Sequence, residues 1–539
     1  MGQPKITFIR KDGLVRRDSS LDHISGLLFY SDSLPSGFSS SDRVKKIFSV
    51  EQAETLGITD DHSDETVATG GNVEVTTAGG TGDVNTIKID GVVLGSYTVA
   101  ASDTPTLVAV GLRAAVNALT SQHGFVAAGS TAHVALTAPD AMGIVPNGAT
   151  ISFTSSGTGA ATVTQFSSGV GSFKAVMHYH ISEFFREKPD GILYVGIYAE
   201  ATYTGAEVYT MQVAANGEMR QLGIFIDDAA FASSQLTATQ TYLDNLRAEK
   251  KNLFALLHAD MSSATLATLA DLSLLSASKV GCVLGEDGNY HQLAYSATKS
   301  YVQGDKAKWL NKTYICNLDN TGQPPYDETY WVEVSLNLTD ILGHSISTLG
   351  SALGVVASIP VNESIAYVEK NQLASGNTLD VAGFATGDLY QGQAPSLLDT
   401  LTEYHYIFLR KFQDNAGTYY NDSWTATAES GDYATIENNR TMDKIERLVY
   451  LALLPKLNAP LFVDSDGKLS QDTVDLYENI ASNPLEGMLI SQEISSYSVT
   501  IDPDRDVLTT SKLIVVVKAV PVGVAREIEV NNSFTVNVS

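Results

Sequence analysis

The chain has 539 residues, carries a formal net charge of −27, and is 44% hydrophobic. Its length predicts several domains, and its hydrophobic share excludes a chain that is disordered throughout. The excess of acidic residues argues against nucleic acid as a partner, because nucleic-acid binding relies on Lys and Arg to neutralise phosphates. The two cysteines, Cys282 and Cys316, are too few for a disulfide framework and lack the spacing of a zinc site.

Two segments bear on location. The first residues, Met1–Lys5, lack the apolar stretch of a secretory signal, so we expect synthesis and folding in a cytoplasm. The longest uncharged apolar run, Ile341–Ile359, has 19 residues, which is long enough in principle to cross a bilayer. It contains serines, glycines and a histidine and has no basic flank. We therefore interpret it as a buried helix and expect no membrane insertion.

The N-terminal region, residues 1–65, predicts an arm followed by the start of a core. Ile6 and Phe8 alternate with polar residues in a short strand before a hairpin turn. An apolar strand at 27–30 and a brief helix at 49–56 follow.

The composition changes sharply between residues 66 and 172. Only seven residues in this segment are charged, and it is rich in Gly, Ser, Thr and Val. Stretches that alternate between apolar and polar residues favour strands, and one helix is expected near 107–119. We predict a separate, inserted β-rich domain.

The middle region, residues 173–400, predicts a different kind of domain. Short apolar runs alternate there with helical stretches, such as the helix whose buried face is marked by Leu236, Leu243 and Leu246. The runs lie at 192–197, 222–226, 253–257 and 280–284. Such alternation is typical of βαβ units, so we expect a mainly parallel sheet. Between residues 301 and 400, the sequence pattern assigns no helix or strand other than the apolar helix named above.

The C-terminal region predicts a core domain at 401–525 and a strand arm at 526–539. An amphipathic helix is expected at 439–454 and a second one from Ser470 to about residue 481. Strands follow at 495–501 and at 513–517, the latter with the continuous apolar pattern of a central strand. The apolar residues of the tail share one parity: Ile528, Val530, Phe534, Val536 and Val538. A strand of this kind at the end of the sequence needs a neighbour.

Several local patterns carry residue types found in catalytic or ligand-binding sites. His178 and His180 are expected on one strand face, and Asp227-Asp228 in the loop after a strand. The others are Asp60–Glu65, Gly79–Gly82, Asp464–Gly467 and Asp502–Asp506. None completes a metal, phosphate-loop or calcium-loop signature, so we expect no metal, no cofactor and no catalytic residue.

A basic stripe lies on the helix at 439–454. Arg440, Lys444 and Arg447 are spaced i, i+4 and i+7 on its polar face. The stripe is interpreted either as a docking face or, since Asp443 and Glu446 lie nearby, as a solvated and locally paired surface.

The order of the C-terminal elements resembles contractile tail sheath proteins of bacteriophages and of phage-derived contractile injection systems. The resemblance rests on the helix 440–456, the loop 458–462, the second helix and the strands at 495–501 and 513–517, with Pro521-Val522 and the strand-like tail after them. The N-terminal arm also fits this family, and the inserted β-rich domain resembles the variable, outward-facing outer domains that such sheaths carry.

The resemblance implies a structural subunit rather than an enzyme. Its fold would be a multidomain α+β and α/β chain, in which N- and C-terminal parts form a sheath-like core with extended terminal arms. Subunits would form stacked hexameric rings around an inner tail tube protein, between baseplate and tail terminator proteins. Both arms would complete sheets in neighbouring subunits, and Arg440, Lys444 and Arg447 would face the tube.

The same resemblance implies a location and a task. The particle would be a virion tail or an injection-particle sheath, assembled in the host bacterial cytoplasm. Its contraction would drive the tube through a cell envelope, with genome ejection in a phage.

Two other classes of protein stay open from the sequence. One is an α/β hydrolase or transferase with an accessory β domain, acting through Asp227 or Asp228. The other is a surface adhesin, which the Ser- and Thr-rich segment suggests but the expected lack of an export signal disfavours.

Overall fold

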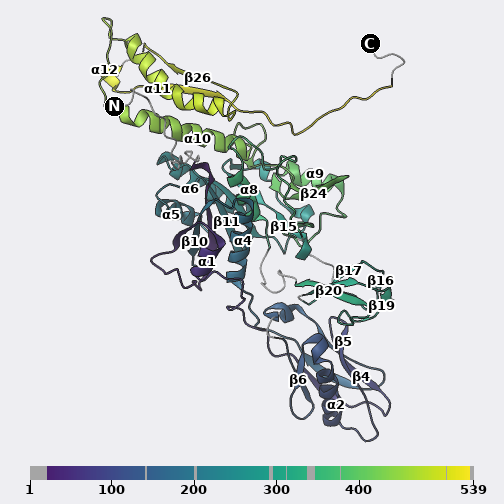
Figure 1. The fold of residues 1–539 in the computed structure, drawn as a ribbon. Coiled ribbons are helices and arrows are strands. Elements are labelled where there is room, and N and C mark those ends of the chain that lie inside the picture. The colour runs from purple at the N-terminus through teal and green to yellow at the C-terminus, as the bar shows by residue number, and fades with distance from the viewer. Residues whose placement is uncertain are drawn as a thin grey trace, which may run out of the picture.

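The computed structural model of the chain describes residues 21–139, 142–199, 203–290, 295–310, 312–336, 346–376, 378–504 and 507–534. These residues form an elongated molecule with an α/β body in the middle (Figure 1). A unit made mostly of strands lies at one end of the body, and two long helices lie at the other. The mixed α/β, multidomain fold class expected from the sequence is confirmed at this level.

The body is built on a seven-stranded sheet with the strand order β2-β10-β1-β11-β12-β14-β22. Its paired strands are parallel except β2, which is antiparallel to β10. The strands are β1 (Ile24–Tyr30), β2 (Val44–Ile47), β10 (Ile192–Tyr198), β11 (Gln221–Ala230), β12 (Phe254–Asp260), β14 (Val280–Val283) and β22 (Tyr406–Ile407). The four apolar runs predicted as parallel strands are therefore confirmed, as β10, β11, β12 and β14.

The N-terminal part of the chain contributes an interior strand of this sheet. β1 pairs with β10 on one side and with β11 on the other, so residues that precede the outer unit are built into the α/β body. The predicted strand at 27–30 is confirmed as part of β1. Ile6 and Phe8 lie outside the described residues, so the N-terminal arm stays a prediction.

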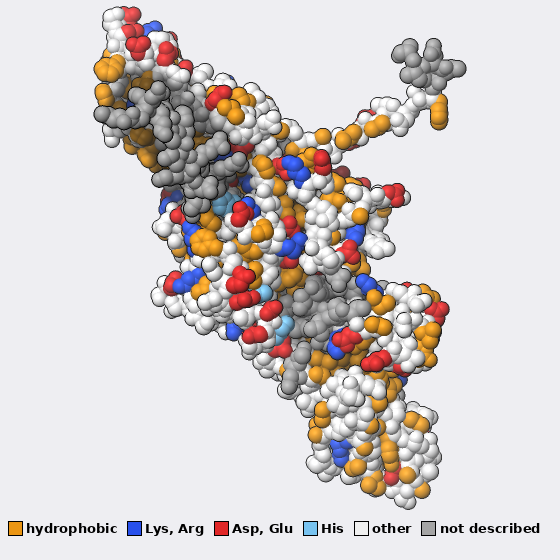
Figure 2. Space-filling view, in the orientation of Figure 1, with side chains coloured by type: hydrophobic (Ala, Val, Ile, Leu, Met, Phe, Trp, Pro, Cys, Tyr) orange, Lys and Arg blue, Asp and Glu red, His pale blue; other side chains and the backbone are white. Residues whose placement is uncertain are grey.

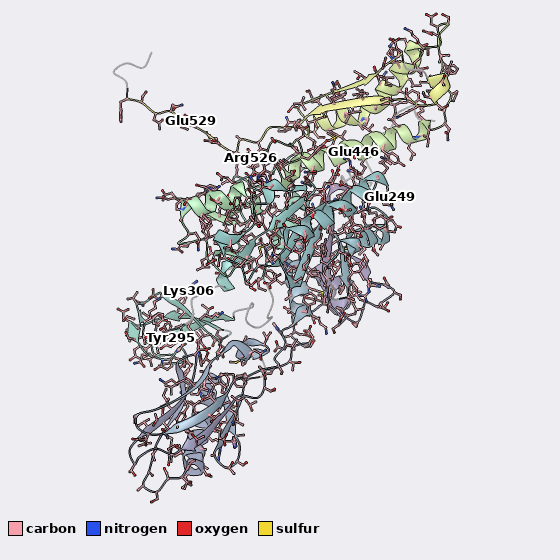
Figure 3. The ribbon with its side chains drawn as sticks, turned by 180° about the vertical axis from the view of Figure 1, so that it is seen from behind. Glu249, Tyr295, Lys306, Glu446, Arg526 and Glu529 are labelled. Carbon is pink, nitrogen blue, oxygen red and sulfur yellow. The ribbon has the colours of Figure 1, made fainter. Side chains whose placement is uncertain are left out.

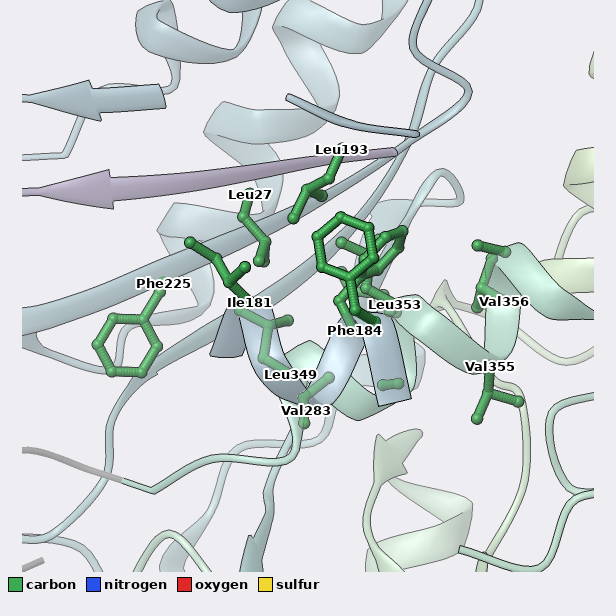
Figure 4. Close-up of a cluster of buried hydrophobic side chains, with 14 of the residues drawn as sticks. Leu27, Ile181, Phe184, Leu193, Phe225, Val283, Leu349, Leu353, Val355 and Val356 are labelled. Carbon is green, nitrogen blue, oxygen red and sulfur yellow. The ribbon is translucent and has the colours of Figure 1, made fainter. Parts of the chain in front are cut away.

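Helices cover both faces of the sheet. α1 (Val50–Thr55), α4 (Phe173–Glu187) and α8 (Leu349–Ser358) pack on one face, and α5 (Ala206–Ala214) and α6 (Ser233–Ala248) pack on the other. Figure 4 shows part of the hydrophobic core between the sheet and the helices α1, α4 and α8, with Phe184 of α4 and Leu353 of α8 close to Leu27 of β1. The helix α9 (Pro395–Glu403) and the antiparallel pairs β13–β25, β15–β21 and β23–β24 complete the body. These strands span Ser276–Ala277, Ala426–Thr427, Gly285–Asp287, Ala382–Phe384, Leu409–Phe412 and Asn415–Tyr420.

α8 lies within the apolar run Ile341–Ile359 that is predicted to be a buried helix, and the structure confirms a buried helix at this place in the run. Residues 341–345 of the run lie outside the described residues. Leu349 through Ala357 are all buried, and the helix packs tightly against α4. A Cβ atom added at Gly350 would lie 2.3 Å from the carbonyl oxygen of His180, so only glycine permits this approach. Within the described stretches, no helix has both the length and the apolar character needed to span a membrane.

His178 and His180 lie on α4 and not on a strand, so that prediction was wrong. The helix begins after Ser172, whose side chain accepts a hydrogen bond from the backbone N–H of Ala175. His180 is fully buried, and its ring lies 4.6 Å from the ring of Phe225, between centroids. Within the part of the chain that the structure describes, neither ring nitrogen of His180 has a hydrogen-bond partner.

Replacing His180 by Leu is expected to make the stability of the chain less sensitive to acid. Burial and the neighbouring His258 lower the pKa of His180 to about 3, whereas the unfolded chain protonates this ring near 6.5. Protons therefore bind preferentially to the unfolded state between these values. The wild-type chain should lose about 1.4 kcal/mol of unfolding free energy per pH unit below pH 6.5, relative to the variant.

Urea unfolding at several pH values between 7 and 4.5 measures this difference. Burial raises the pKa of Glu187 to about 7 and that of Asp287 to about 6, and these groups act in the opposite direction. The comparison with the variant removes their contribution, because both chains carry them. His133→Leu, at a partly exposed position in the 66–172 segment, is the matched control. Equal pH slopes for wild type and His180→Leu would contradict the prediction.

The strand-rich unit at one end of the body contains two small sheets, β6-β7-β3-β9 and β5-β4-β8, formed by residues of the 66–172 segment. Its strands are β3 (Asn72–Thr77), β4 (Val84–Ile89), β5 (Val92–Thr98), β6 (Val126–Ala128), β7 (His133–Thr137), β8 (Ile151–Ser155) and β9 (Ala160–Thr164). The predicted helix is present as α2 (Pro105–Ala118), followed by the short α3 (Thr120–His123).

A second segment of the chain, residues 295–336, also belongs to this unit. From the sequence it was assigned to the middle domain, 173–400. Residues 295–336 form a three-stranded sheet of β17 (Lys306–Trp309), β18 (Lys312–Cys316) and β20 (Trp331–Leu336), and the pair β16 (Ser300–Tyr301) and β19 (Asn320–Thr321). They share a hydrophobic core with the 66–172 segment. The Tyr326 hydroxyl donates a hydrogen bond to the carbonyl oxygen of Val93 at 2.8 Å. We call residues 66–172 and 295–336 together the outer unit.

The C-terminal region forms a layer of helices and strands at the other end of the body. It contains α10 (Ile436–Leu453), α11 (Gln471–Ile490), β26 (Ser496–Ile501), α12 (Val507–Thr510) and β27 (Val515–Val520). Both predicted helices are confirmed. α11 is longer than expected and continues through Pro484, because Leu485 and Met488 beyond it pack against Ile445 of α10.

Candidate assembly site

β26 and β27 form an isolated ribbon on the helices. The two strands pair antiparallel from Ser496 opposite Val520 to Ile501 opposite Val515. Tyr497, Val499 and Val517 pack against α10 and α11, and the opposite face of the ribbon is exposed. Neither strand pairs with a third one among the described residues, so each leaves one edge of backbone N–H and C=O groups open. A central strand was predicted at 513–517. That prediction was wrong within a single chain, because β27 has a paired strand on one side only.

The C-terminal arm, residues 521–534, projects from the body without a helix or a strand (Figures 1 and 2). Its apolar side chains are exposed, with exposed fractions of 78% for Ile528 and 69% for Val530, and full exposure of Phe534. Such exposure of apolar side chains is unfavourable in water. Val536 and Val538 lie outside the described residues.

Arg526 ties the base of this arm to the body. Its Nε atom lies 3.0 and 3.1 Å from the two carboxylate oxygens of Asp422, and its Nη2 atom lies 2.7 Å from Glu437 Oε1. Nη2 also donates to the Ser423 hydroxyl at 3.1 Å, and the guanidinium lies 4.7 Å from the centroid of the Trp424 ring. We call these five residues the Arg526 clamp. Figure 3 shows Arg526 at the body and Glu529 further out on the arm.

The two carboxylates that pair with Arg526 are themselves buried in the body. The side chain of Glu437 is 2% exposed and that of Asp422 is 12% exposed. Burial opposes the charge on Arg526, but Asp422 and Glu437 outweigh it and raise the pKa of the guanidinium above its ordinary value. This cluster was not predicted from the sequence.

The basic stripe on α10 does not lie on an exposed face, so that part of the prediction was wrong. Arg440 is buried, and its guanidinium donates to the backbone carbonyl oxygens of Pro360 at 3.1 Å and Ile359 at 3.3 Å. Burial lowers the pKa of Arg440 to about 10.

Lys444 and Arg447 also pair inside the same chain. Lys444 lies 2.7 Å from a carboxylate oxygen of Asp22 and 2.6 Å from one of Glu493, and Arg447 pairs with Asp22 as well. Burial would raise the pKa of Asp22, but these cations outweigh it and lower that pKa. The stripe joins α10 to the body, and contact with a tube would first require these pairs to break.

A groove of about 940 Å³ lies between α10, the body and the ribbon. Arg220, Arg247 and Arg447 line it together with Val517 and Ala519 of β27. Val517 and Ala519 belong to the face of β27 that packs against α10 and α11, so the groove lies beneath the ribbon.

Two further patterns that the sequence offered as candidate sites, Asp60–Glu65 and Asp227-Asp228, lie in ordinary structural positions. Asp64 accepts hydrogen bonds from the Ser172 hydroxyl and the backbone N–H of Lys174 at the start of α4. Asp227-Asp228 lie within β11, which continues to Ala230, and not in a loop after it. Among the described residues, no group of three or more His, Cys, Asp or Glu side chains is placed to hold a metal ion.

Comparisons with known proteins place these features in context. The chain is similar to the anti-feeding prophage helical sheath in its contracted state, with 16% identity, coverage of 69% of this chain and 84% of that chain, and a TM-score of 0.42. It is also similar to a chain of the anti-feeding prophage baseplate, with 15% identity, the same coverages and a TM-score of 0.39. For the PVC extracellular contractile injection system sheath in its contracted state, the identity is 14%, the coverages are 67% and 80%, and the TM-score is 0.41.

The resemblance to contractile sheath proteins is confirmed as a resemblance by these structures. No curated protein matches the chain. The model of the DUF2586 N-terminal domain matches residues 66–424, and the model of the DUF2586 C-terminal domain matches residues 432–539. Because these two models together span most of its length, the chain belongs to the DUF2586 family.

Proposed function

We propose that the chain is the structural subunit of a contractile sheath that polymerises helically around an inner tube and contracts to drive the tube through a cell envelope. One observation carries the proposal: the same chain has an exposed arm with alternating apolar residues and a ribbon with open edges. An extended segment that adds to a sheet edge gains main-chain hydrogen bonds, with alternate side chains for specificity. The arm is suited to be the donor, and the ribbon to be the acceptor.

The arm is positioned to pair with another copy and not with its own ribbon. It follows β27 directly, and Arg526 holds it beside the first turn of α10, from where it points away from the ribbon (Figure 1). A fold back onto β27 would require the clamp to open. Head-to-tail contacts between copies that do not close into a ring produce helical assemblies.

The proposed assembly has stacked hexameric rings around an inner tail tube protein, with baseplate and tail terminator proteins at its ends. Donated strands keep neighbours joined while other contacts exchange during contraction, because main-chain bonds do not depend on the side chains that slide past each other. The subunit acts without catalysis. The particle is a virion tail or an injection-particle sheath that assembles in the host bacterial cytoplasm, and the arm residues 526–539 and 6–8 link its subunits.

Negative-stain electron microscopy of the purified full-length chain, at rising concentration, tests the proposal. We expect tubes or stacked rings with six-fold end views. A second sample with a co-expressed candidate tube protein should give filled, longer tubes. A chain that stays monomeric in both samples would contradict the sheath role.

A further inference from the structure

The base of the C-terminal arm is held far more firmly than the rest of it. The residues from Gly523 to Phe534 are exposed along the backbone path, yet the Arg526 side chain reaches two buried carboxylates, a buried hydroxyl and an indole ring. We propose that the Arg526 clamp is the pivot of the arm: residues 521–526 stay with their own subunit, and only the chain from Glu527 onward is handed to a neighbour. This inference rests on the proposed function.

The clamp is built for a single cation. Among the described residues, Arg526 is the only residue that forms an ion pair with Asp422 or Glu437. The Ser423 hydroxyl donates to the second oxygen of Glu437 at 2.7 Å, which fixes that carboxylate. The ring of Trp424 stacks on His405, with 4.6 Å between ring centroids, so the surface under the guanidinium is also fixed. The anchor point is therefore rigid before the arm binds to it.

The backbone turns sharply at the same place. The N–H of Arg526 donates to the carbonyl oxygen of Val524 at 3.2 Å, which closes a three-residue turn. No backbone hydrogen bond of this kind is formed by residues 527–534 within the described chain. Rotation after Arg526 is thus unhindered, whereas rotation before it is opposed by the turn and the clamp. Pivots of moving segments are typically a few such residues at the end of a fixed element.

The clamp has a clear effect on assembly. Binding of an unrestrained segment loses conformational entropy, and a segment held in the right direction loses less. Fixing six residues at the base also confines the donor strand to a small volume, which raises its effective concentration at one neighbouring acceptor. The clamp should therefore select which neighbour receives the arm and lower the concentration needed for polymerisation.

Spin labels in the monomeric full-length chain test the pivot directly. Distances are measured from Glu429→Cys on the body to Val524→Cys before the clamp and, separately, to Val530→Cys after it. Both native cysteines are buried, so the introduced positions are the accessible ones. We expect a narrow distance distribution for position 524 and a broad one for position 530. Equally broad distributions in the wild-type background would overturn the pivot, whatever the outcome of the tests of the sheath role.

Two clamp variants complete the experiment. Arg526→Gln should broaden the distribution at position 524, and so should the triple variant Arg526→Gln, Asp422→Asn, Glu437→Gln. The triple variant also removes the buried charges, so it separates release of the arm from loss of stability. Both should raise the critical concentration for tube formation at least tenfold. Lys411→Gln, which removes an exposed ion pair with Asp380, is the matched control and should change neither readout. An unchanged critical concentration with a released arm would show that the clamp does not guide assembly.

Discussion

Deletion of residues 527–539 should abolish tube formation and leave a folded chain in solution. The truncated chain ends at Arg526, so the clamp and every described contact of the body are kept. The segment removed carries the exposed Ile528, Val530 and Phe534, which contribute nothing to the core of their own subunit. Circular dichroism and thermal unfolding should match the wild-type chain, whereas electron microscopy and sedimentation should detect only monomers.

Two substituted chains of full length sharpen this test. Replacing Ile528, Val530 and Phe534 by Ser removes the apolar face of the donor strand and should prevent assembly as the deletion does. Replacing Asn531 and Ser533, which lie on the opposite face of an extended strand, by Ala keeps the apolar face and should permit assembly. Normal tubes from the truncated chain would show that the arm is not the donor.

Local patterns in the sequence predicted the arm and the parallel sheet, because both depend on periodicity alone. The runs that became β10, β11, β12 and β14 are apolar throughout, as strands buried on both faces must be. The arm was visible as an alternation with no return strand. The place of β1 between β10 and β11 was not visible, because strand order depends on contacts between distant parts of the chain.

The errors on α10 and α4 have a shared cause. A spacing of i, i+4 and i+7 shows that Arg440, Lys444 and Arg447 share one helix face, but it does not show whether that face meets water or a carboxylate of another element. Asp22, which pairs with two of them, lies more than 400 residues earlier in the chain. In α4, two histidines two residues apart fit a strand face, but the cap at Ser172 sets a helix.

No pattern in the sequence predicts the Arg526 clamp. Its acidic members, Asp422 and Glu437, lie about a hundred residues from Arg526 and belong to no motif. The one hint is that Arg526 interrupts a tail otherwise poor in basic residues. Pairing of a tail cation with buried carboxylates is set by the packing of the body, which no local rule supplies.

The second large effect is expected in the outer unit, which should be dispensable for assembly only when it is removed whole. The backbones of Thr66 and Val170 pair with each other, so a short Gly/Ser linker can replace residues 67–169 without straining the body. Glu286 and Ser347 pair in the same way on either side of the second segment. We expect a chain with linkers in place of 67–169 and 295–336 to form tubes of smaller outer diameter.

Removal of residues 67–169 alone should have the opposite result. Tyr326, Trp309 and their neighbours in the 295–336 segment share a core with the removed strands, and they would become exposed together. Exposed apolar patches of this kind drive aggregation. Light scattering should therefore rise for the single deletion and stay at the wild-type level for the double deletion. Loss of tubes in a double-deletion chain that remains monomeric and folded would show instead that the outer unit carries a contact of the framework.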